Sequence, residues 1–136
     1  MDGNGNGNTT VLIADDEPLS LRALGLILGL ERYHLRLAGT ARAAIATLAE
    51  SPPDLIVVDR GMAGADGTAL PVLLRRMAAR VPMVIVSELP GRMSPPVAES
   101  VEVRRPVDAQ RLREAVARQL RAPSSRNGGS DRQYAA

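Results

Sequence analysis

Hydrophobic and polar residues follow two different patterns along the chain. Unbroken aliphatic runs cover residues 11–14, 55–58 and 81–86, as expected for central parallel strands that are buried on both faces. Residues 34–37 and 101–103 instead alternate between polar and apolar side chains, as expected for strands at a sheet edge. The contrast predicts a five-stranded parallel sheet with strand order 2-1-3-4-5.

Apolar residues at helical spacing fill the gaps between these strands. The first predicted helix begins near Pro18, which suits a first helical turn, and the second follows Thr40, a common N-cap residue. The third carries an apolar stripe that starts at Leu70, and the last follows Asp108, another usual N-cap. Strands that alternate with helices predict a doubly wound α/β domain, with helices on both faces of the sheet.

The first predicted helix is apolar on several of its sides. Gly25 and Gly29 lie four residues apart in it, while Leu26, Ile27 and Leu30 fall outside the stripe that would face the sheet. Either the glycines permit a close helix–helix contact, or the helix is simply well buried. We favour the second interpretation.

Both ends of the chain and one internal segment interrupt the pattern. Residues 1–8 and 122–136 have the Gly, Asn and Ser content of disordered tails, which leaves residues 9–121 as one domain. Between the fourth and fifth strands, residues 88–96 contain three prolines and a glycine. Because proline disrupts helices, we expect a loop there, or a shortened helix of one to two turns around residues 93–99.

Composition limits the classes of protein to which the chain can belong. Its 136 residues are 45% hydrophobic and include no cysteine, which allows one globular domain and excludes disulfides and thiolate metal sites. All 17 basic residues are arginines, dispersed along the chain and not interleaved with aromatic residues, so the pattern does not favour nucleic-acid binding. The chain shows no signal peptide and no apolar run of the ~18 residues that a membrane span needs. We therefore expect a cytoplasmic protein.

Three aspartates follow two of the predicted central strands. Asp15 and Asp16 come after the first strand, and Asp59 closes the third. The carboxyl ends of neighbouring strands meet where the strand order reverses, which is the usual position of a ligand site in such sheets. Three carboxylates this close repel one another unless a cation binds between them. A divalent cation beside a strand-end aspartate suggests a phosphoryl-accepting residue. An ordinary turn at Asp59, and helix capping by Asp15 and Asp16, stay open as simpler interpretations.

Five segments in order along the chain resemble the response-regulator receiver domains of two-component signalling. They are Asp-Asp-Glu-Pro at 15–18, Pro-Asp-Leu-Ile-Val-Val-Asp at 53–59, Met62 with Asp-Gly at 66–67, Val-Ile-Val-Ser at 84–87, and Arg-Pro at 105–106. The resemblance covers about residues 10–121. It implies the flavodoxin-like receiver fold.

The resemblance also implies roles for individual residues. Asp59 would be the phosphoacceptor, Ser87 would hydrogen-bond a phosphoryl oxygen, and Arg105 takes the place of the family's lysine. The implied cofactor is Mg²⁺, which prefers a few protein oxygens together with water and phosphate oxygens. Its implied ligands are oxygens of Asp15, either nearby or acting through water, and of Asp16, Asp59 and the Gly61 backbone carbonyl.

Four positions depart from the family pattern. Arg105 carries a planar guanidinium fork where lysine would present a compact charge. Glu88 follows Ser87 where a small residue is usual, and Ala63 replaces a proline. Glu102 stands where the fifth strand normally carries an aromatic residue. The coupled hydroxyl–aromatic switch of typical receivers therefore cannot operate here in its usual form.

These observations support two functions, of which we favour the first. The chain would be a stand-alone receiver that accepts a phosphoryl group on Asp59 from a sensor histidine kinase or a phosphotransfer protein. It would signal to a downstream protein target by contact, and would be no enzyme beyond catalysing its own phosphorylation and dephosphorylation. Alternatively, it is a degenerate receiver that acts as a phosphorylation-independent interaction module. Either protein could form a weak homodimer. A flavin- or nucleotide-binding protein of similar topology is disfavoured, because no glycine-rich phosphate loop follows a strand.

Overall fold

A computed structural model describes residues 6–88 and 97–122 of the chain. Its strands form one five-stranded sheet in which all neighbours run parallel, in the order β2-β1-β3-β4-β5. This order confirms the one predicted from the contrast between unbroken and alternating apolar runs. The strands are β1 (Thr10–Ala14), β2 (His34–Ala38), β3 (Leu55–Asp59), β4 (Met83–Ser87) and β5 (Ser100–Arg104).

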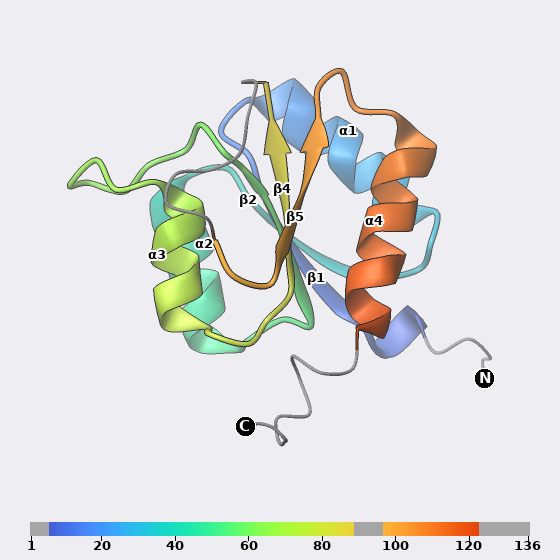
Figure 1. Ribbon diagram of the computed structural model, residues 1–136, viewed down its shortest axis with the longest axis horizontal. Coiled ribbons are helices and arrows are strands. Elements are labelled where there is room, and N and C mark those ends of the chain that lie inside the picture. Colours follow the sequence, from blue (N-terminus) through green and yellow to red (C-terminus); the bar gives the residue numbers. More distant parts are fainter. Residues whose placement is uncertain (1–5, 89–96, 123–136) are drawn as a thin grey trace.

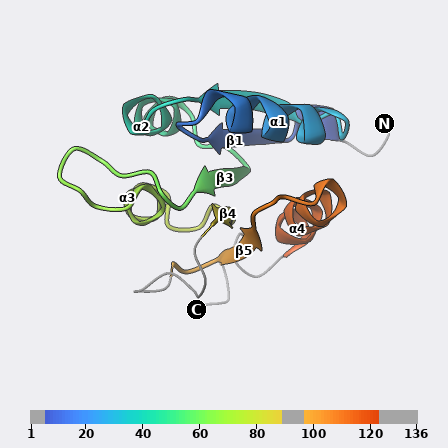
Figure 2. The ribbon, with the colours of Figure 1, turned by 90° about the horizontal axis from the view of Figure 1, so that it is seen from above.

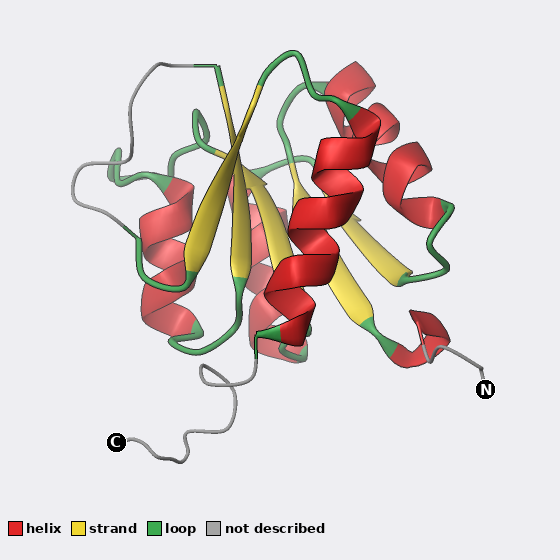
Figure 3. Ribbon diagram, turned by 45° about the vertical axis from the view of Figure 1, so that its right-hand side comes forward, coloured by secondary structure: helices red, strands yellow, loops and turns green. Residues whose placement is uncertain are grey.

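Helices cover both faces of the sheet, as expected for a doubly wound domain. In Figure 1, α2 and α3 lie on the left of the sheet and α1 and α4 on the right, and Figure 2 shows the same pairing from above. The resulting arrangement of helices around a central sheet is visible in Figure 3. The helices are α1 (Pro18–Gly29), α2 (Ala41–Glu50), α3 (Leu70–Met77) and α4 (Ala109–Arg121), with a short 3-10 helix, η1 (Asn6–Asn8), before β1.

The core consists of two apolar clusters, one on each face of the sheet, because successive strand residues point to opposite faces. In β3, Leu55 and Val57 belong to the cluster that includes residues of α1 and α4, whereas Ile56 and Val58 belong to the cluster with α2 and α3. Almost every residue of β1, β3 and β4 is buried, while β2 and β5 are mostly partly exposed. Burial on both faces is why the three central strands carry unbroken aliphatic runs.

Side-chain caps mark the beginnings of three helices. The Thr40 hydroxyl accepts a 3.0 Å hydrogen bond from the Ala43 amide, and the Asp108 carboxylate accepts one of 2.9 Å from the Arg111 amide. Both predicted N-caps are thus confirmed. Helix α1 is capped by Glu17, whose carboxylate accepts a 2.8 Å bond from the Ser20 amide, and the sequence reasoning missed it because glutamate is not a preferred N-cap.

Helix α1 is less buried than expected. A Cβ atom on Gly25 would meet the side chain of Leu37 on β2 at an ordinary distance of 3.7 Å, so no second helix approaches that glycine closely. Leu19, Leu26 and Leu30 are 73%, 68% and 75% exposed. Both interpretations of this helix, a close helix–helix contact through the glycines and general burial, are therefore wrong. The helix packs onto the sheet through one face, which carries the buried residues Leu24 and Leu28.

The segment between β4 and β5 is only partly described. Strand β4 begins at Met83, later than the predicted start, since Pro82 has no amide proton for the ladder and the Val81 carbonyl accepts a bond from Arg75. Glu88 forms a bend and residues 98–99 form a turn. The shortened helix predicted around residues 93–99 falls mainly in 89–96, outside the described residues. The same holds for most of the two predicted tails, so the domain boundaries stay a prediction.

Candidate functional site at the carboxyl ends of β1 and β3

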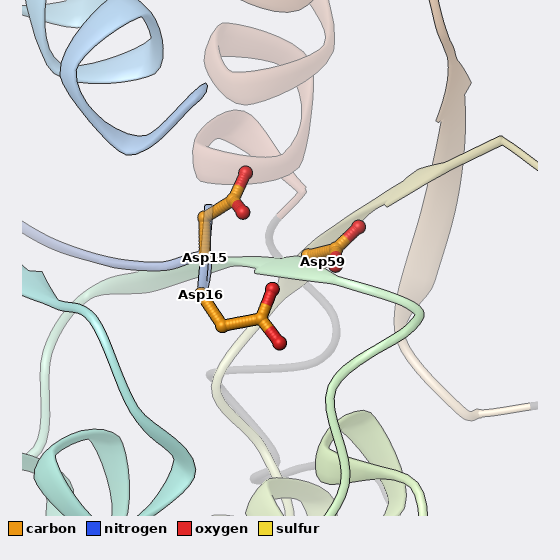
Figure 4. Close-up of side chains that lie close together, drawn as sticks. All are labelled: Asp15, Asp16 and Asp59. Carbon is orange, nitrogen blue, oxygen red and sulfur yellow. The ribbon is translucent and has the colours of Figure 1, made fainter. Parts of the chain in front are cut away.

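The three aspartates converge at the point where the strand order reverses. Asp15 and Asp16 follow β1 and Asp59 is the last residue of the neighbouring strand β3, and Figure 4 shows their side chains around one space. Each offers a carboxylate oxygen that lies within 4.8 Å of the other two. The predicted convergence is confirmed. The aspartates line a cleft of about 460 Å³ that also includes Ser87 and Arg105.

Asp15 is the buried member of the group, with 1% of its surface exposed. Its carboxylate accepts a 3.0 Å hydrogen bond from the Glu17 amide and another from the Ser20 hydroxyl. It also pairs at 2.8 Å with the Arg105 guanidinium. Asp15 therefore helps to fix the first turn of α1, so the simpler interpretation of helix capping coexists with its place in the acidic group.

Arg105 supplies a positive charge inside the cleft. One guanidinium nitrogen, NH2, lies 2.8 Å from Asp15 Oδ2 and 3.5 Å from Asp59 Oδ1. Its backbone amide donates a 2.9 Å bond to the Ser87 carbonyl, which ties the end of β5 to β4. Arg105 thus bridges two of the three carboxylates, and its closer partner is Asp15 rather than the predicted phosphoacceptor.

The electrostatic environment of Asp59 disfavours its charged form. Burial raises the pKa of this carboxyl, and the neighbouring Asp15 carboxylate raises it further, while Arg105 offsets part of the effect. Glu88 stands where the family pattern has a small residue, and its carboxylate would repel a phosphoryl group. Its side chain is 77% exposed and lies 4.0 Å from Arg105 Nε. Solvent and Arg105 therefore both weaken any repulsion from Glu88.

Ser87 lies fully buried at the end of β4, where its hydroxyl meets Arg60. Arg60 NH1 donates to Ser87 Oγ at 3.3 Å and lies 4.0 Å from Glu102 Oε1 on β5. The Arg60 amide donates to the Val86 carbonyl at 2.8 Å, so the backbone of Arg60 continues the pairing of β3 with β4. The sequence reasoning missed Arg60, although its place directly after Asp59 and beside β4 was a usable signal.

Gly61 lies against the phosphoacceptor candidate. A Cβ atom at this position would stand 3.4 Å from Asp59 Oδ2, tight enough to require a small shift. Gly61 also lines the acidic cleft, while the role of its carbonyl as a metal ligand stays a prediction.

The residues present fit a hard divalent cation. All three converging side chains offer carboxylate oxygens, the donor type that Mg²⁺ prefers, and the cleft leaves room for the waters that this ion retains. Arg105 already balances part of the negative charge.

Comparison with known proteins agrees with this geometry. A sequence model of the response regulator receiver domain matches residues 11–117. The chain belongs to this family. Receiver domains serve signal transduction in two-component systems, and the sheet order, the acidic cleft and the family assignment are mutually consistent.

Individual relatives share parts of this receiver domain. The transcriptional regulatory protein KdpE of Mycobacterium tuberculosis is 41% identical over 59 residues, which are 43% of this chain and 26% of KdpE. The match thus spans about a quarter of that relative. The receiver domain of NtrX from Brucella abortus is 26% identical, with a TM-score of 0.70 over 82% of this chain and 98% of that one. A CheY-like receiver from Methanospirillum hungatei, 21% identical, has a TM-score of 0.71 over 82% and 93% of the two chains and supports the fold alone.

The helices of the receiver domain are short relative to a lipid bilayer. Within residues 6–88 and 97–122, no helix combines the length and the apolar character needed to cross a membrane.

Proposed function

We propose that this receiver accepts a phosphoryl group on Asp59. The observation that carries the proposal is the convergence of three carboxylates on adjacent strand ends, in a chain that belongs to the receiver family. A carboxylate oxygen of Asp59 attacks the phosphorus of a phosphohistidine on the donor. The new P–O bond forms as the P–N bond breaks, and the imidazole leaves as a neutral base after taking up a proton from solvent.

Asp15, Asp16, Asp59 and the Gly61 carbonyl would hold Mg²⁺, which neutralises the charge that develops on a transferring phosphoryl group. The buried Ser87 hydroxyl donates a hydrogen bond to one phosphoryl oxygen. Arg105 releases part of its contact with Asp59 and pairs with another phosphoryl oxygen, for which a guanidinium is a good match. The metal ion, the Ser87 hydroxyl and the Arg105 guanidinium thus each stabilise negative charge on the phosphoryl oxygens.

The donor would be a sensor histidine kinase or a phosphotransfer protein. We propose that the receiver acts in the cytoplasm and passes the signal to a downstream protein by direct contact. The similarity to KdpE covers only 26% of that protein, so the transcriptional activity named there is not extended to this chain.

Transfer of radiolabelled phosphate tests the proposal. The full chain is incubated with Mg²⁺ and a phosphorylated histidine kinase, or with the small donor acetyl phosphate, and acid-stable and base-labile label is counted. Asp59→Asn should abolish the label. Asp54→Asn, directly before the same strand, should keep it, because asparagine can still accept the hydrogen bond from the Thr10 amide. Label that persists on Asp59→Asn would refute the assignment.

A second function is favoured by one specific observation, the ion pairs of Arg105. Because Arg105 already pairs with Asp15 and Asp59 and offsets part of their charge, the cleft depends less on a bound cation, as a phosphorylation-independent interaction module would require. The two functions differ in one measurement. Binding of a downstream partner, once identified by pull-down, should change with Asp59→Asn in a phosphorylated receiver and stay the same in a degenerate one.

A further inference from the structure

The contacts of Arg60 connect the phosphoacceptor strand to the edge strand of the sheet. Arg60 follows Asp59 directly, and its guanidinium nitrogen NH1 reaches Ser87 Oγ on β4 at 3.3 Å and Glu102 Oε1 on β5 at 4.0 Å. The two charged side chains are only 17% and 20% exposed. We infer that Arg60 is a positioning residue that couples phosphorylation of Asp59 to the surface of β5 by exchanging Glu102 for the phosphoryl group. This inference rests on the proposed function of Asp59.

The charge added by phosphorylation is large enough to move Arg60. A phosphoryl group brings about two negative charges and three strong acceptor oxygens to the residue next to Arg60. Guanidinium groups form short, charge-assisted and often bidentate hydrogen bonds to such oxygens. The existing contact with Glu102, at 4.0 Å, is by comparison a long ion pair. The electrostatic attraction of Arg60 to the phosphoryl oxygens is therefore stronger than its attraction to Glu102.

Ser87 links the two states of Arg60. Its hydroxyl oxygen accepts the hydrogen bond from Arg60. When the same hydroxyl donates to a phosphoryl oxygen, it moves toward Asp59, and the guanidinium that is bonded to it moves in the same direction. Both displacements withdraw positive charge from Glu102.

Glu102 has other partners available once Arg60 moves. It lines a groove of about 520 Å³ between β5 and α4, whose walls include Arg104, Arg111 and Arg118. A carboxylate released by Arg60 can pair with one of these arginines, which changes the charge presented by the groove. The result is an ionic switch at Glu102, the position where typical receivers carry an aromatic side chain that moves together with the hydroxyl residue at the end of β4.

Amide NMR of the full chain tests this coupling. Spectra are recorded with Mg²⁺ alone and with Mg²⁺ at saturating beryllofluoride, which mimics a phosphoryl group on aspartate. In the wild type, we expect beryllofluoride to shift the amides around Asp59 and also those around Glu102. In Arg60→Gln, the shifts around Asp59 should remain at saturation, while those around Glu102 should be at least about threefold smaller.

Two further variants separate coupling from a general structural effect. Glu102→Gln removes the other end of the ion pair without touching Arg60, and should reduce the shifts of the β5 amides in the same way. Arg22→Gln makes the same substitution at an exposed position of α1 that lines neither the acidic cleft nor the groove. It is the matched control and should leave the β5 shifts unchanged. The double variant with both Arg60→Gln and Glu102→Gln should behave like either single variant, because each breaks the same link.

Each alternative result has a distinct meaning. Full-sized shifts around Glu102 in Arg60→Gln, with beryllofluoride bound, would overturn the coupling while leaving the proposed phosphoacceptor intact. A wild-type protein with no beryllofluoride response around Asp59 would refute the proposed function itself, and the coupling with it.

Discussion

Arg105 determines much of the charge balance in the acidic cleft. Its guanidinium lies 2.8 Å from Asp15 and 3.5 Å from Asp59, so it occupies part of the region between carboxylates that a bound cation would also neutralise. A lysine ammonium in this position would present one compact charge instead of a fork that reaches both carboxylates. We therefore expect the arginine to compete with Mg²⁺.

Replacing Arg105 by alanine should tighten Mg²⁺ binding. The variant loses a cation that competes for Asp15 and Asp59, and partly exposed ion pairs of this kind are worth about 1 kcal/mol, or roughly a fivefold change in Kd. Mg²⁺ titrations followed by the Asp16 and Gly61 amide signals measure the affinity. Arg104→Ala, at the neighbouring position on β5, should leave it unchanged. Equal or weaker binding by Arg105→Ala would show that the arginine does not compete with the metal.

Replacing Asp59 by asparagine should stabilise the fold near neutral pH when a chelator is present. Burial and the Asp15 carboxylate raise the pKa of Asp59 in the folded state. Over the range between its ordinary value of 3.8 and that raised value, the folded protein holds a proton that the unfolded chain has lost. The wild type therefore loses stability as pH rises through this range. Asp59→Asn removes the repulsion between the charged Asp59 and Asp15 carboxylates in the folded state. Its free energy of unfolding should therefore rise by an amount on the order of 1 kcal/mol.

Urea unfolding at several pH values measures this difference. The extra free energy of unfolding of Asp59→Asn over the wild type should be largest above the raised pKa and should vanish as pH falls below 3.8. Asp66→Asn is the control and should lower stability instead. Hydrogen bonds from Thr68 lower the pKa of Asp66 and favour its charged form in the folded protein. An advantage of Asp59→Asn that grows on acidification would contradict the prediction.

The sequence predicted the positions of the acidic residues better than it predicted the arginines that contact them. Asp15, Asp16 and Asp59 could be grouped because each stands at the end of a recognisable strand, and strand order then brings them together. The contacts of Arg60 and Arg105 could not be predicted in the same way. Long side chains reach several partners from one backbone position, and which carboxylate each one meets depends on packing that the sequence pattern does not encode.

Arg75 joins three elements on the side of the sheet covered by α3. Its guanidinium donates to the carbonyls of Ala78 at 2.7 Å, Val81 at 2.6 Å and Glu99 at 3.3 Å. These carbonyls belong to the residue after α3, to the turn before β4 and to the residue before β5. Burial lowers the pKa of Arg75, but an arginine remains cationic at any ordinary pH. One side chain thus fixes the approach to two strands.

Replacing Arg75 by methionine should therefore destabilise the domain. The variant keeps an apolar stem of similar length but leaves carbonyl groups without their donor, at a cost of about 1–3 kcal/mol for each one that stays buried. Arg76→Met is the matched control, since Arg76 is the exposed neighbour on the same helix, and should change stability by no more than about 0.5 kcal/mol. Unfolding in urea compares the two variants. Equal effects would show that the three hydrogen bonds do not stabilise the approach to β4 and β5.

The helices and strands themselves were largely predictable. Thr40 and Asp108 carry the side chains that favour N-caps, and both cap the helices they precede. Helix α1 shows the limit of such reasoning: Leu26 and Leu30 indicated burial, yet both are exposed. Apolar content alone does not show whether a second element covers the outer side of a helix, because that depends on what else the fold places there.

The two apolar clusters account for the whole described domain. One cluster packs α1 and α4 against the sheet and the other packs α2 and α3, and every residue assigned to either lies between positions 11 and 120. The sheet itself contributes to both clusters, since adjacent residues of β1, β3 and β4 point to opposite faces. Loss of any one helix therefore exposes one side of the central strands.

A fragment of residues 6–122 should consequently fold as well as the full chain. It contains all the strands and helices of the described residues and both of their apolar clusters, so we expect its free energy of unfolding to agree with that of the full chain within about 0.5 kcal/mol. A shorter fragment that ends at residue 108 loses α4 and its buried residues Leu112 and Val116. It should not unfold cooperatively, because emptying two such core positions costs several kcal/mol, on the order of the stability of a small domain. Thermal and urea unfolding followed by circular dichroism compare the three proteins. A fragment of residues 6–122 that is less stable than the full chain by more than about 2 kcal/mol would show that residues outside 9–121 belong to the folded domain, since surface changes rarely have effects of that size.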